Sequence, residues 1–490
     1  MVSFVSKPNS VVLYWDLPET FKKGDSFEVK LGEKSLGTTE KCHLEAENLT
    51  SDTEYSFTLI GKDFKEEITA KTEPCRRRIN VVDFGAVGDG KTLNTKAIQA
   101  AIDSCKAGEC VYIPEGDFMT GSLFLHSDME LYLEKGAILH GTANVHDYEP
   151  KIKSRFEGIE MMCYAALINV GELDRNKVTC KNVRICGEGS VCGGGRPLAE
   201  EVIRVETILM KDYIASLGDS VKECETSTTI QGRVRPRLIN LSSAENVTVY
   251  GITVENGASW NFHMIYSKNV VTCGCTFKSD GVWNGDGWDP DSSSNCTIFG
   301  CQFYTGDDAV AIKSGKNPEG NVINRPCEHI RVFDCISHYG HGITVGSEMS
   351  GGINDIKIWN CDMGDSVFGI EIKATKKRGG FVRNVSVRNT RTCRVLMHSV
   401  GYNDDGIGAP TVPIFEDCSF EDLEITARLK GMDGENRECQ AIELSGFDVP
   451  GHFIKNIRFK NILIDSGESK RQTIYLQCCE GISFENINCK

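Results

Sequence analysis

The chain has 490 residues, of which 40% are hydrophobic and 25% charged, and its formal net charge is −15. A chain of this length forms two or more domains, or one elongated repeat. The acidic balance argues against nucleic acid as a partner, because phosphate binding requires a basic surface. No apolar run approaches the roughly 20 residues of a membrane helix. We therefore expect neither a nucleic-acid partner nor a membrane.

The chain contains 22 cysteines. Free cysteine behaves as a small buried hydrophobe, so we expect reduced cysteines in the core. The spacing of Cys273 and Cys275, and of Cys478 and Cys479, does not fit a structural zinc site. Residues 1–15 lack the basic-then-apolar pattern of a signal peptide. Both observations predict a cytoplasmic protein, or a periplasmic or secreted one if a signal was removed.

Residues 1–72 are predicted to form a small β-sandwich. Strand-forming segments with alternating apolar residues occupy 11–15, 27–31 and 55–60. Trp15 occupies the position at which a fibronectin type III module has its core tryptophan. The segment 49–55, which leads to Tyr55, resembles the tyrosine corner of such modules. The sandwich either packs on its neighbour alone or also forms one wall of a substrate pocket.

Residues 73–78 are the predicted linker, with a solvated basic triplet at 76–78. A second domain is predicted over 79–490. It opens with a helix at 94–106, whose apolar residues share one face. Such a helix can cap the end of a solenoid and cover an open sheet edge.

A strand motif then recurs along the second domain. From residue 246 its successive starts are separated by 23, 26, 34, 26 and 29 residues. A recurring strand-rich unit of this length without intervening helices indicates a solenoid. We predict a parallel β-helix whose coils stack at ~4.8 Å. The motif starts at Asn182, Asn246, Asn269, Asn295, His329, Asp355, Asn384, Asn456 and Gly481.

A second strand recurs in the same coils, at 288–291, 310–313, 343–346, 370–373, 442–445 and 474–477. Equivalent positions of a solenoid form a column. The residues that stand two positions before the first four of these strands should therefore lie above one another in a column. Asp307 should lie beside the second of them, Asp308. The members are Asp286, Asp308, His341 and Phe368.

This column can carry out acid–base chemistry. Asp286 and Asp308 would lie about one strand spacing apart, so at least one of their pKa values should rise. A carboxyl group with a raised pKa beside an ionised carboxylate is the pair that glycoside hydrolysis requires. His341 would tune their protonation or hold a hydroxyl. Lys313 and Lys373 would bring positive charge that suits an acidic sugar.

Two other interpretations apply to the same residues. Aspartates before strands occur in ordinary turns, where the side chain bonds its own backbone. A turn explains any one of these residues well, but it does not explain why all four share one register. Calcium is an alternative because Asp286, Asp289 and Asp291 cluster. The spacing, however, lacks the glycine at the sixth and the glutamate at the twelfth position of a helical calcium loop. We predict no metal and no cofactor.

Four ordered motifs resemble glycoside hydrolase family 28, the polygalacturonases and their pectin-degrading relatives. The resemblance covers about residues 79–490 and implies a right-handed parallel β-helix that inverts configuration. It also implies the exo-acting bacterial type, in which an N-terminal fibronectin-like module corresponds to residues 1–72. The motifs are Asn-Gly-Asp-Gly at 284–287, Gly-Asp-Asp at 306–308, Gly-His-Gly at 340–342 and Ile-Lys at 372–373.

The resemblance also implies roles for individual residues. Asp307 would be the general acid, Asp286 and Asp308 would activate the water, and His341 would support the acid. Lys373 would bind a substrate carboxylate or hydroxyls.

The chain departs from the family pattern at one position, where Glu371 replaces the arginine before Ile-Lys. An arginine can bind a galacturonate carboxylate through two parallel hydrogen bonds. Arg378 is the candidate replacement for this arginine. The residues predicted to bind substrate are Lys373, Lys313, Arg378, Asp289 and Glu371.

The predicted function is exo-acting, inverting hydrolysis of α-1,4 bonds in galacturonate-containing pectin oligosaccharides. The insert at 193–236 and the N-terminal module would close one end of the cleft. The nearest alternative is a rhamnogalacturonan or other modified-pectin hydrolase of the same family, favoured by Glu371. A calcium-dependent pectate lyase and a non-catalytic carbohydrate-binding solenoid are the alternatives from other classes.

Overall fold

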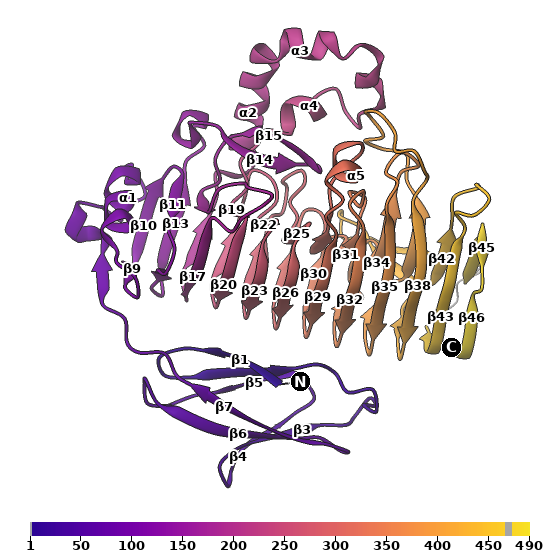
Figure 1. The fold of residues 1–490 in the computed structure, drawn as a ribbon, viewed down its shortest axis with the longest axis horizontal. Helices are drawn as coiled ribbons and strands as arrows, with labels where there is room; N and C mark the ends of the chain where they lie inside the picture. The colour runs from indigo at the N-terminus through magenta and orange to yellow at the C-terminus, as the bar shows by residue number, and fades with distance from the viewer. Residues whose placement is uncertain (1, 466–472) are drawn as a thin grey trace.

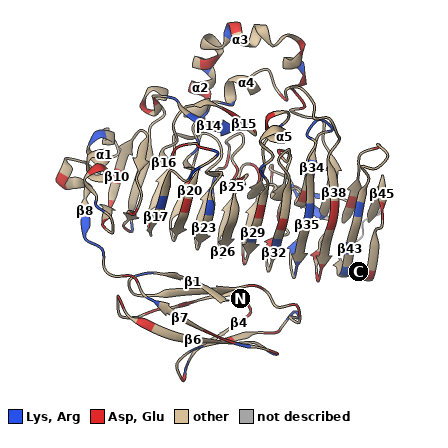
Figure 2. Cartoon of the chain, in the orientation of Figure 1, with Lys and Arg blue, Asp and Glu red and all other residues tan. Residues whose placement is uncertain are grey.

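The computed structural model describes residues 2–465 and 473–490. Figure 1 shows a long coil of stacked strands, a small module of two sheets below it, and a group of helices above it. Acidic and basic side chains are interspersed along the outer strands of the coil (Figure 2). No helix among the described residues is both long and apolar enough to cross a membrane.

The coil is a parallel β-helix, as the repeat predicts. One of its sheets has 24 strands and another has eleven, and neighbouring strands in both are parallel. The eleven strands are β11 (Leu123–Leu125), β16 (Ile168–Val170), β19 (Ile239–Ser242), β22 (Phe262–Ile265), β25 (Trp288–Asp291), β28 (Val310–Ile312), β31 (Gly342–Val345), β34 (Gly369–Ala374), β37 (Val395–Ser399), β42 (Ile442–Ser445) and β44 (Ile474–Gln477).

The recurring asparagines have a structural reason. The start of each predicted motif adopts a left-handed backbone, for example φ 56° at Asn246, 54° at Asn269 and 53° at Asn295. Asparagine tolerates this conformation better than most residues. The side chains also bond from coil to coil, since Asn269 Nδ2 donates to Asn246 Oδ1 over 3.1 Å. A further copy of the motif begins at Asp417, with φ 55°, and was not predicted from the sequence.

The ends of the β-helix differ. Helix α1 (Thr95–Ser104) buries Ile98, Ala101 and Ile102 against the first coils, as predicted. The prediction of a repeat without intervening helices was wrong, because an insertion after β18 (Ser190–Cys192) is helical and rises above the coil (Figure 1). Its helices are α2 (Gly195–Leu209), α3 (Lys211–Ser216), η3 (Gly218–Glu223) and α4 (Thr229–Gly232), and a later loop carries α5 (Glu319–Ile323).

The N-terminal module has seven strands in two antiparallel sheets. Trp15 is buried in its core, and the Tyr55 hydroxyl accepts a hydrogen bond from Thr50 N over 2.8 Å, which is a tyrosine-corner contact. The fibronectin type III assignment and the boundary at residue 72 stay predictions. The strands are β1 (Val2–Ser6), β2 (Val11–Trp15) and β5 (His43–Ala46) in one sheet, and β4 (Lys34–Thr39), β3 (Phe27–Leu31), β6 (Glu54–Ile60) and β7 (Lys65–Lys71) in the other.

The module packs along one face of the β-helix, on the side away from the inserted helices (Figure 1). Its core is continuous with a row of side chains from successive coils. Tyr14 stacks on Phe299 with 4.8 Å between ring centroids, and Phe299, Phe333 and Trp359 stack on one another. His43 and the backbone N–H of Cys42 bind the buried carboxylate of Asp334. These contacts fix the module to the coil.

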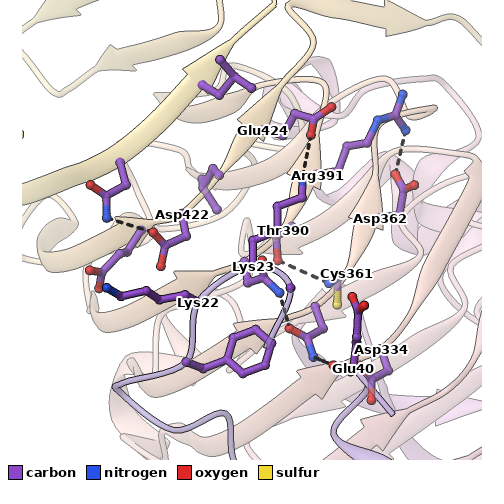
Figure 3. Close-up of a pocket in the computed structure, with 18 of the residues that line it drawn as sticks. Lys22, Lys23, Glu40, Asp334, Cys361, Asp362, Thr390, Arg391, Asp422 and Glu424 are labelled. Carbon is purple, nitrogen blue, oxygen red and sulfur yellow. Dashed lines mark hydrogen bonds and ion pairs between the residues drawn. The ribbon is translucent and has the colours of Figure 1, made fainter. Parts of the chain in front are cut away.

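A cavity of about 1010 Å³ remains at this joint. Figure 3 shows Lys22 and Lys23 of the module facing the coil, where Lys23 Nζ lies 3.2 Å from Glu424 Oε2. Arg77 and Arg78 of the linker are exposed, as predicted for the basic triplet, although all three arginines also have partners. Arg76 binds Glu73, and Arg78 lies over the ring of Tyr112 at 4.5 Å.

Candidate active site

The predicted column forms in the structure. Trp288 pairs with Val310, Val310 with Ile343 and Ile343 with Ile370, which is the register expected from the sequence. Phe262 pairs with Trp288 one coil earlier, so Trp260 also belongs to the column. The polar residues Asp286, Asp308 and His341 are therefore bounded by an aromatic residue at each end. All of them line one cavity of about 280 Å³.

Asp307, Asp308 and His341 form a compact group. His341 Nδ1 lies 2.8 Å from Asp307 Oδ1 and 3.4 Å from Asp308 Oδ1. Burial favours the neutral imidazole, but the carboxylates of Asp307 and Asp308 outweigh it and raise the pKa of His341 well above its usual value. The ring of Phe368 packs edge-on against His341. His341 is thus held as an imidazolium between two aspartates.

Asp286 belongs to a second group around Lys313. Lys313 Nζ lies 3.1 Å from Asp286 Oδ2, 3.9 Å from Asp289 Oδ2 and 3.8 Å from Glu348 Oε2. Burial raises the pKa of Asp286 to about 8; Lys313 opposes this, and Asp307 adds to it. Burial and Asp286 also raise the pKa of Asp289. Asp286 therefore holds a proton at neutral pH despite the lysine beside it.

Asp308 has the opposite electrostatic environment. Burial opposes its ionisation, but Lys373, His341 and Lys313 outweigh burial and hold the pKa of Asp308 far below its usual range. Thr344 Oγ1 also donates a hydrogen bond to Asp308 Oδ1 over 2.7 Å. The two carboxyl groups of the column thus differ in charge, a protonated Asp286 next to an ionised Asp308. Asp308 can therefore accept a proton, whereas Asp286 can donate a hydrogen bond.

Lys373 and Glu371 lie together in the next coil. Lys373 Nζ is 2.8 Å from Glu371 Oε2 and 3.9 Å from Asp308 Oδ2, and His398 Nε2 is 2.7 Å from Glu371 Oε1. Glu371 therefore neutralises Lys373 instead of adding a free charge. His398 was not expected here, because β37 carries no copy of the second-strand motif that the sequence pattern detects.

Two of the predicted substrate-binding residues do not line the cavity. Arg378 is buried and donates to Ser347 O, Asn317 Oδ1 and Asn403 O, so its guanidinium supports the loops behind the cavity. Asp289 is fully buried beneath Asp286, which excludes contact with a substrate. The prediction that Arg378 replaces the missing arginine is wrong on this geometry.

Two segments outside the repeat also contribute to the lining of the cavity. Glu225 from the helical insertion and Asn403 from a later loop line the cavity together, and Glu225 N donates to Asn403 Oδ1. Behind them Arg233 binds Asp405 through two contacts of 3.0 and 2.9 Å, and it also binds Glu157. We call residues 223–233 and 401–405 the end wall. The N-terminal module contributes no residue to the cavity, which corrects the expectation that it forms a wall.

A metal could be considered at one place among the described residues. Asp307, Asp308 and His341 offer ligand atoms within 4.8 Å of one another. The raised pKa of His341 favours the imidazolium, which cannot ligate a metal. The calcium cluster suggested by the sequence does not form, because Asp291 pairs with buried Arg155 over 2.8 Å.

Comparison with known proteins shows which family the chain resembles. Residues 193–401 match Glycosyl hydrolases family 28, and residues 78–144 match the family Rhamnogalacturonase A/epimerase, pectate lyase-like. A probable polygalacturonase of Vitis vinifera is 30% identical, over 72% of this chain and 70% of its own length. An exo-poly-alpha-D-galacturonosidase of Dickeya chrysanthemi is 28% identical, over 82% of this chain and 70% of its own length.

Among solved structures, the family 28 exopolygalacturonase of Yersinia enterocolitica has a TM-score of 0.81 and 26% identity, and the match covers 100% of this chain and 98% of that one. The right-handed parallel β-helix with a small N-terminal sheet domain is thereby confirmed as the fold class. The chain belongs to glycosyl hydrolases family 28 and is a glycoside hydrolase.

Proposed function

We propose that this enzyme hydrolyses α-1,4 bonds in galacturonate-containing pectin oligosaccharides, from one end of the chain and with inversion. The observation that carries the proposal is the meeting of Asp286, Asp307, Asp308 and His341 in one cavity. The names of the relatives from Dickeya chrysanthemi and Yersinia enterocolitica support the same substrate and the same exo action.

The lowered pKa of Asp308 supports its role as the base, and the Gly-Asp-Asp motif, which resembles that of the family, gives the role of acid to Asp307. Asp307 delivers a proton to the glycosidic oxygen as the C–O bond breaks, and His341 holds its carboxyl group in place. Ionised Asp308 takes a proton from the water whose oxygen attacks the anomeric carbon. Protonated Asp286 donates a hydrogen bond that orients this water. Each turnover consumes one water, and the proton on Asp308 returns to Asp307 through solvent.

The end wall supports exo action. Glu225 and Asn403 line the cavity, the buried Arg233–Asp405 pair holds their two segments together, and we infer that they block the path of a longer chain. Only the end of an oligosaccharide then fits beyond the reacting bond. Product analysis on a defined pentagalacturonate tests this proposal. A single small product in the first minutes supports it, whereas a spread of sizes contradicts it.

A second substrate class is favoured by one observation. Lys313 and Lys373 are the lysines of the cavity, and carboxylates of the protein already surround both. A substrate with fewer carboxylates, such as rhamnogalacturonan or another modified pectin, suits such a site. A panel of oligogalacturonates and rhamnogalacturonan fragments, compared by kcat/KM, decides between the two.

We also propose a reducing compartment, with the cytoplasm first. Most cysteines of the described chain are buried thiols within the coils, as is usual for proteins kept reduced. Counting free thiols in protein isolated from the native cell under denaturing, non-reducing conditions tests this. A count far below 22 would contradict it.

A further inference from the structure

One exposed aromatic side chain has no role in the site described above. The chain has five tryptophans, and all lie within the described residues. Trp283 is 47% exposed, whereas Trp15, Trp260, Trp288 and Trp359 are buried at 3% or less. The next residue, Asn284, lines the cavity. A large aromatic ring therefore lies in solvent directly outside the proposed reaction centre.

The loop that carries this ring is firmly held. The buried Arg235 donates from Nη1 to Trp283 O over 2.9 Å and to Ala258 O over 3.1 Å, and it also binds the Asn284 side chain. Ser279 Oγ donates to Gly285 O across the base of the loop. The ring is thus carried by a fixed backbone, although it buries little of its own apolar surface. Single exposed hydrophobic side chains are common, but this one follows a fixed backbone beside a cavity-lining residue and offers a large apolar face.

A cation lies against the same ring. The guanidinium of Arg196, in the first turn of α2, is 4.6 Å from the ring centroid of Trp283. Its ionic partner is Glu200 at 2.8 Å, and both side chains are more than half exposed. An exposed pair of this kind contributes little to stability, so Arg196 can exchange this partner for another carboxylate. The lysines of the cavity, in contrast, are buried among acidic groups.

We propose that Trp283 and Arg196 form a sugar-binding subsite outside the cavity, for one uronate residue of the oligosaccharide. The sugar packs against the exposed part of the indole, and its carboxylate pairs with the Arg196 guanidinium in place of Glu200. Because the end wall is inferred to block the cavity on one side, the rest of a long substrate leaves past this loop. The inference rests on the proposed function. It adds the residue that recognises the carboxylate of the substrate, Arg196.

Fluorescence offers a direct test, because Trp283 is the one tryptophan of the five that a solute can reach. In the Asp307→Asn variant, which should bind without turnover, acrylamide quenching is measured with and without tetragalacturonate. We expect tetragalacturonate to lower the quenching constant severalfold, and maltotetraose to leave it unchanged. With Trp283→Phe added, little quenching should remain in either case. Unchanged quenching at a tetragalacturonate concentration that calorimetry shows to be saturating would overturn the subsite.

Kinetics with the active enzyme provide a second test. Trp283→Ala and Arg196→Gln should raise KM for tetragalacturonate by roughly 3- to 30-fold, the range of one cation–π or stacking contact, and leave digalacturonate unaffected. Trp283→Phe should retain most of the affinity, and Tyr213→Ala, an exposed aromatic of α3, is the matched control. If the wild type cleaves oligogalacturonates but these variants match it at every length, the subsite is wrong and the proposed function stands. If the wild type cleaves none of them, the proposed function fails, and the subsite fails with it.

Discussion

The Nζ atom of Lys313 lies 3.1 Å from Oδ2 of Asp286, and yet the pKa of Asp286 is raised to about 8. Opposite charges at this distance normally lower the pKa of a carboxyl group. Here the effect of burial on the pKa is larger than that of Lys313. The charge of Lys313 is shared among Asp286, Asp289 and Glu348. The same cavity keeps Asp308 ionised through Lys373 and His341. The site therefore holds two aspartates of one column in different charge states.

Replacing Asp307 by asparagine should leave the fold intact and lower kcat by roughly 10² to 10⁴, the usual contribution of a general acid. The loss should be much smaller on an aryl galacturonide whose phenol leaves without a proton. Steady-state kinetics on both substrates measure the difference. Asp365→Asn, an exposed aspartate away from the cavity, is the matched control. Near-normal turnover of the natural substrate by Asp307→Asn would contradict the assignment.

The raised pKa of Asp286 predicts a dependence of stability on pH. The folded state keeps the proton up to about pH 8, whereas an ordinary aspartate releases it near 3.8. The folded state therefore binds more protons between these values, and stability falls as the pH rises through this window. This contribution is fully present below 3.8 and lost above about 8.

Asp286→Asn is neutral at every pH and removes this loss. We expect the variant to have a Tm a few degrees above the wild type at pH 8, with the two values converging near pH 4. Melting curves over this range, with Asp365→Asn as the control, measure the effect. A variant less stable than the wild type at pH 8 would show that Asp286 is ionised in the folded protein.

The end wall predicts a change of product. Asp405→Asn removes the charge that joins Arg233 to the later loop, and a buried arginine left with fewer partners is costly. The loop should then move away from Glu225 and open the cavity, so that pentagalacturonate yields intermediate sizes as well as the end product. Chromatography of early products measures this. Asp365→Asn, an exposed aspartate away from the cavity, should keep the wild-type product.

Activity should survive metal removal. The imidazolium of His341 competes with any metal at Asp307 and Asp308, and a hydrolase that works by acid–base catalysis needs none. Dialysis against a chelator followed by an assay for reducing ends should give unchanged rates. Absorbance in the ultraviolet should not rise, because hydrolysis forms no unsaturated product. Loss of activity that calcium restores would favour the lyase alternative instead.

The repeat allowed much of the fold to be predicted. Strand register in a solenoid follows from the spacing of equivalent residues, so the neighbours of Asp308 in the column follow from that spacing alone. The helical insertion could not be predicted from the repeat, since it interrupts the pattern and follows no period. The β37 coil was missed because Val395 begins a strand without the usual motif ahead of it.

The roles of charged residues were predicted less well. Arg378 was placed near the substrate because it follows Lys373 closely in sequence, but its guanidinium turns to Asn317 and to backbone carbonyls behind the cavity. Asp289 points away from the core, since its neighbour Trp288 points into it, but Lys313 and Asp286 cover its carboxylate. Sequence distance from a catalytic residue does not tell which way a side chain points, and the loops that decide this are the irregular part of the chain.

The row of stacked rings under the N-terminal module has a practical consequence. Tyr250, Phe299, Phe333 and Trp359 are buried in one cluster with the core of the module, and they come from different coils of the β-helix. A catalytic domain expressed from residue 79 onward would carry these side chains in water, on a face far from the reaction. Such a truncated enzyme would associate through the bare rings. We therefore expect the module to keep the β-helix soluble by covering this apolar surface, whether or not it binds a sugar.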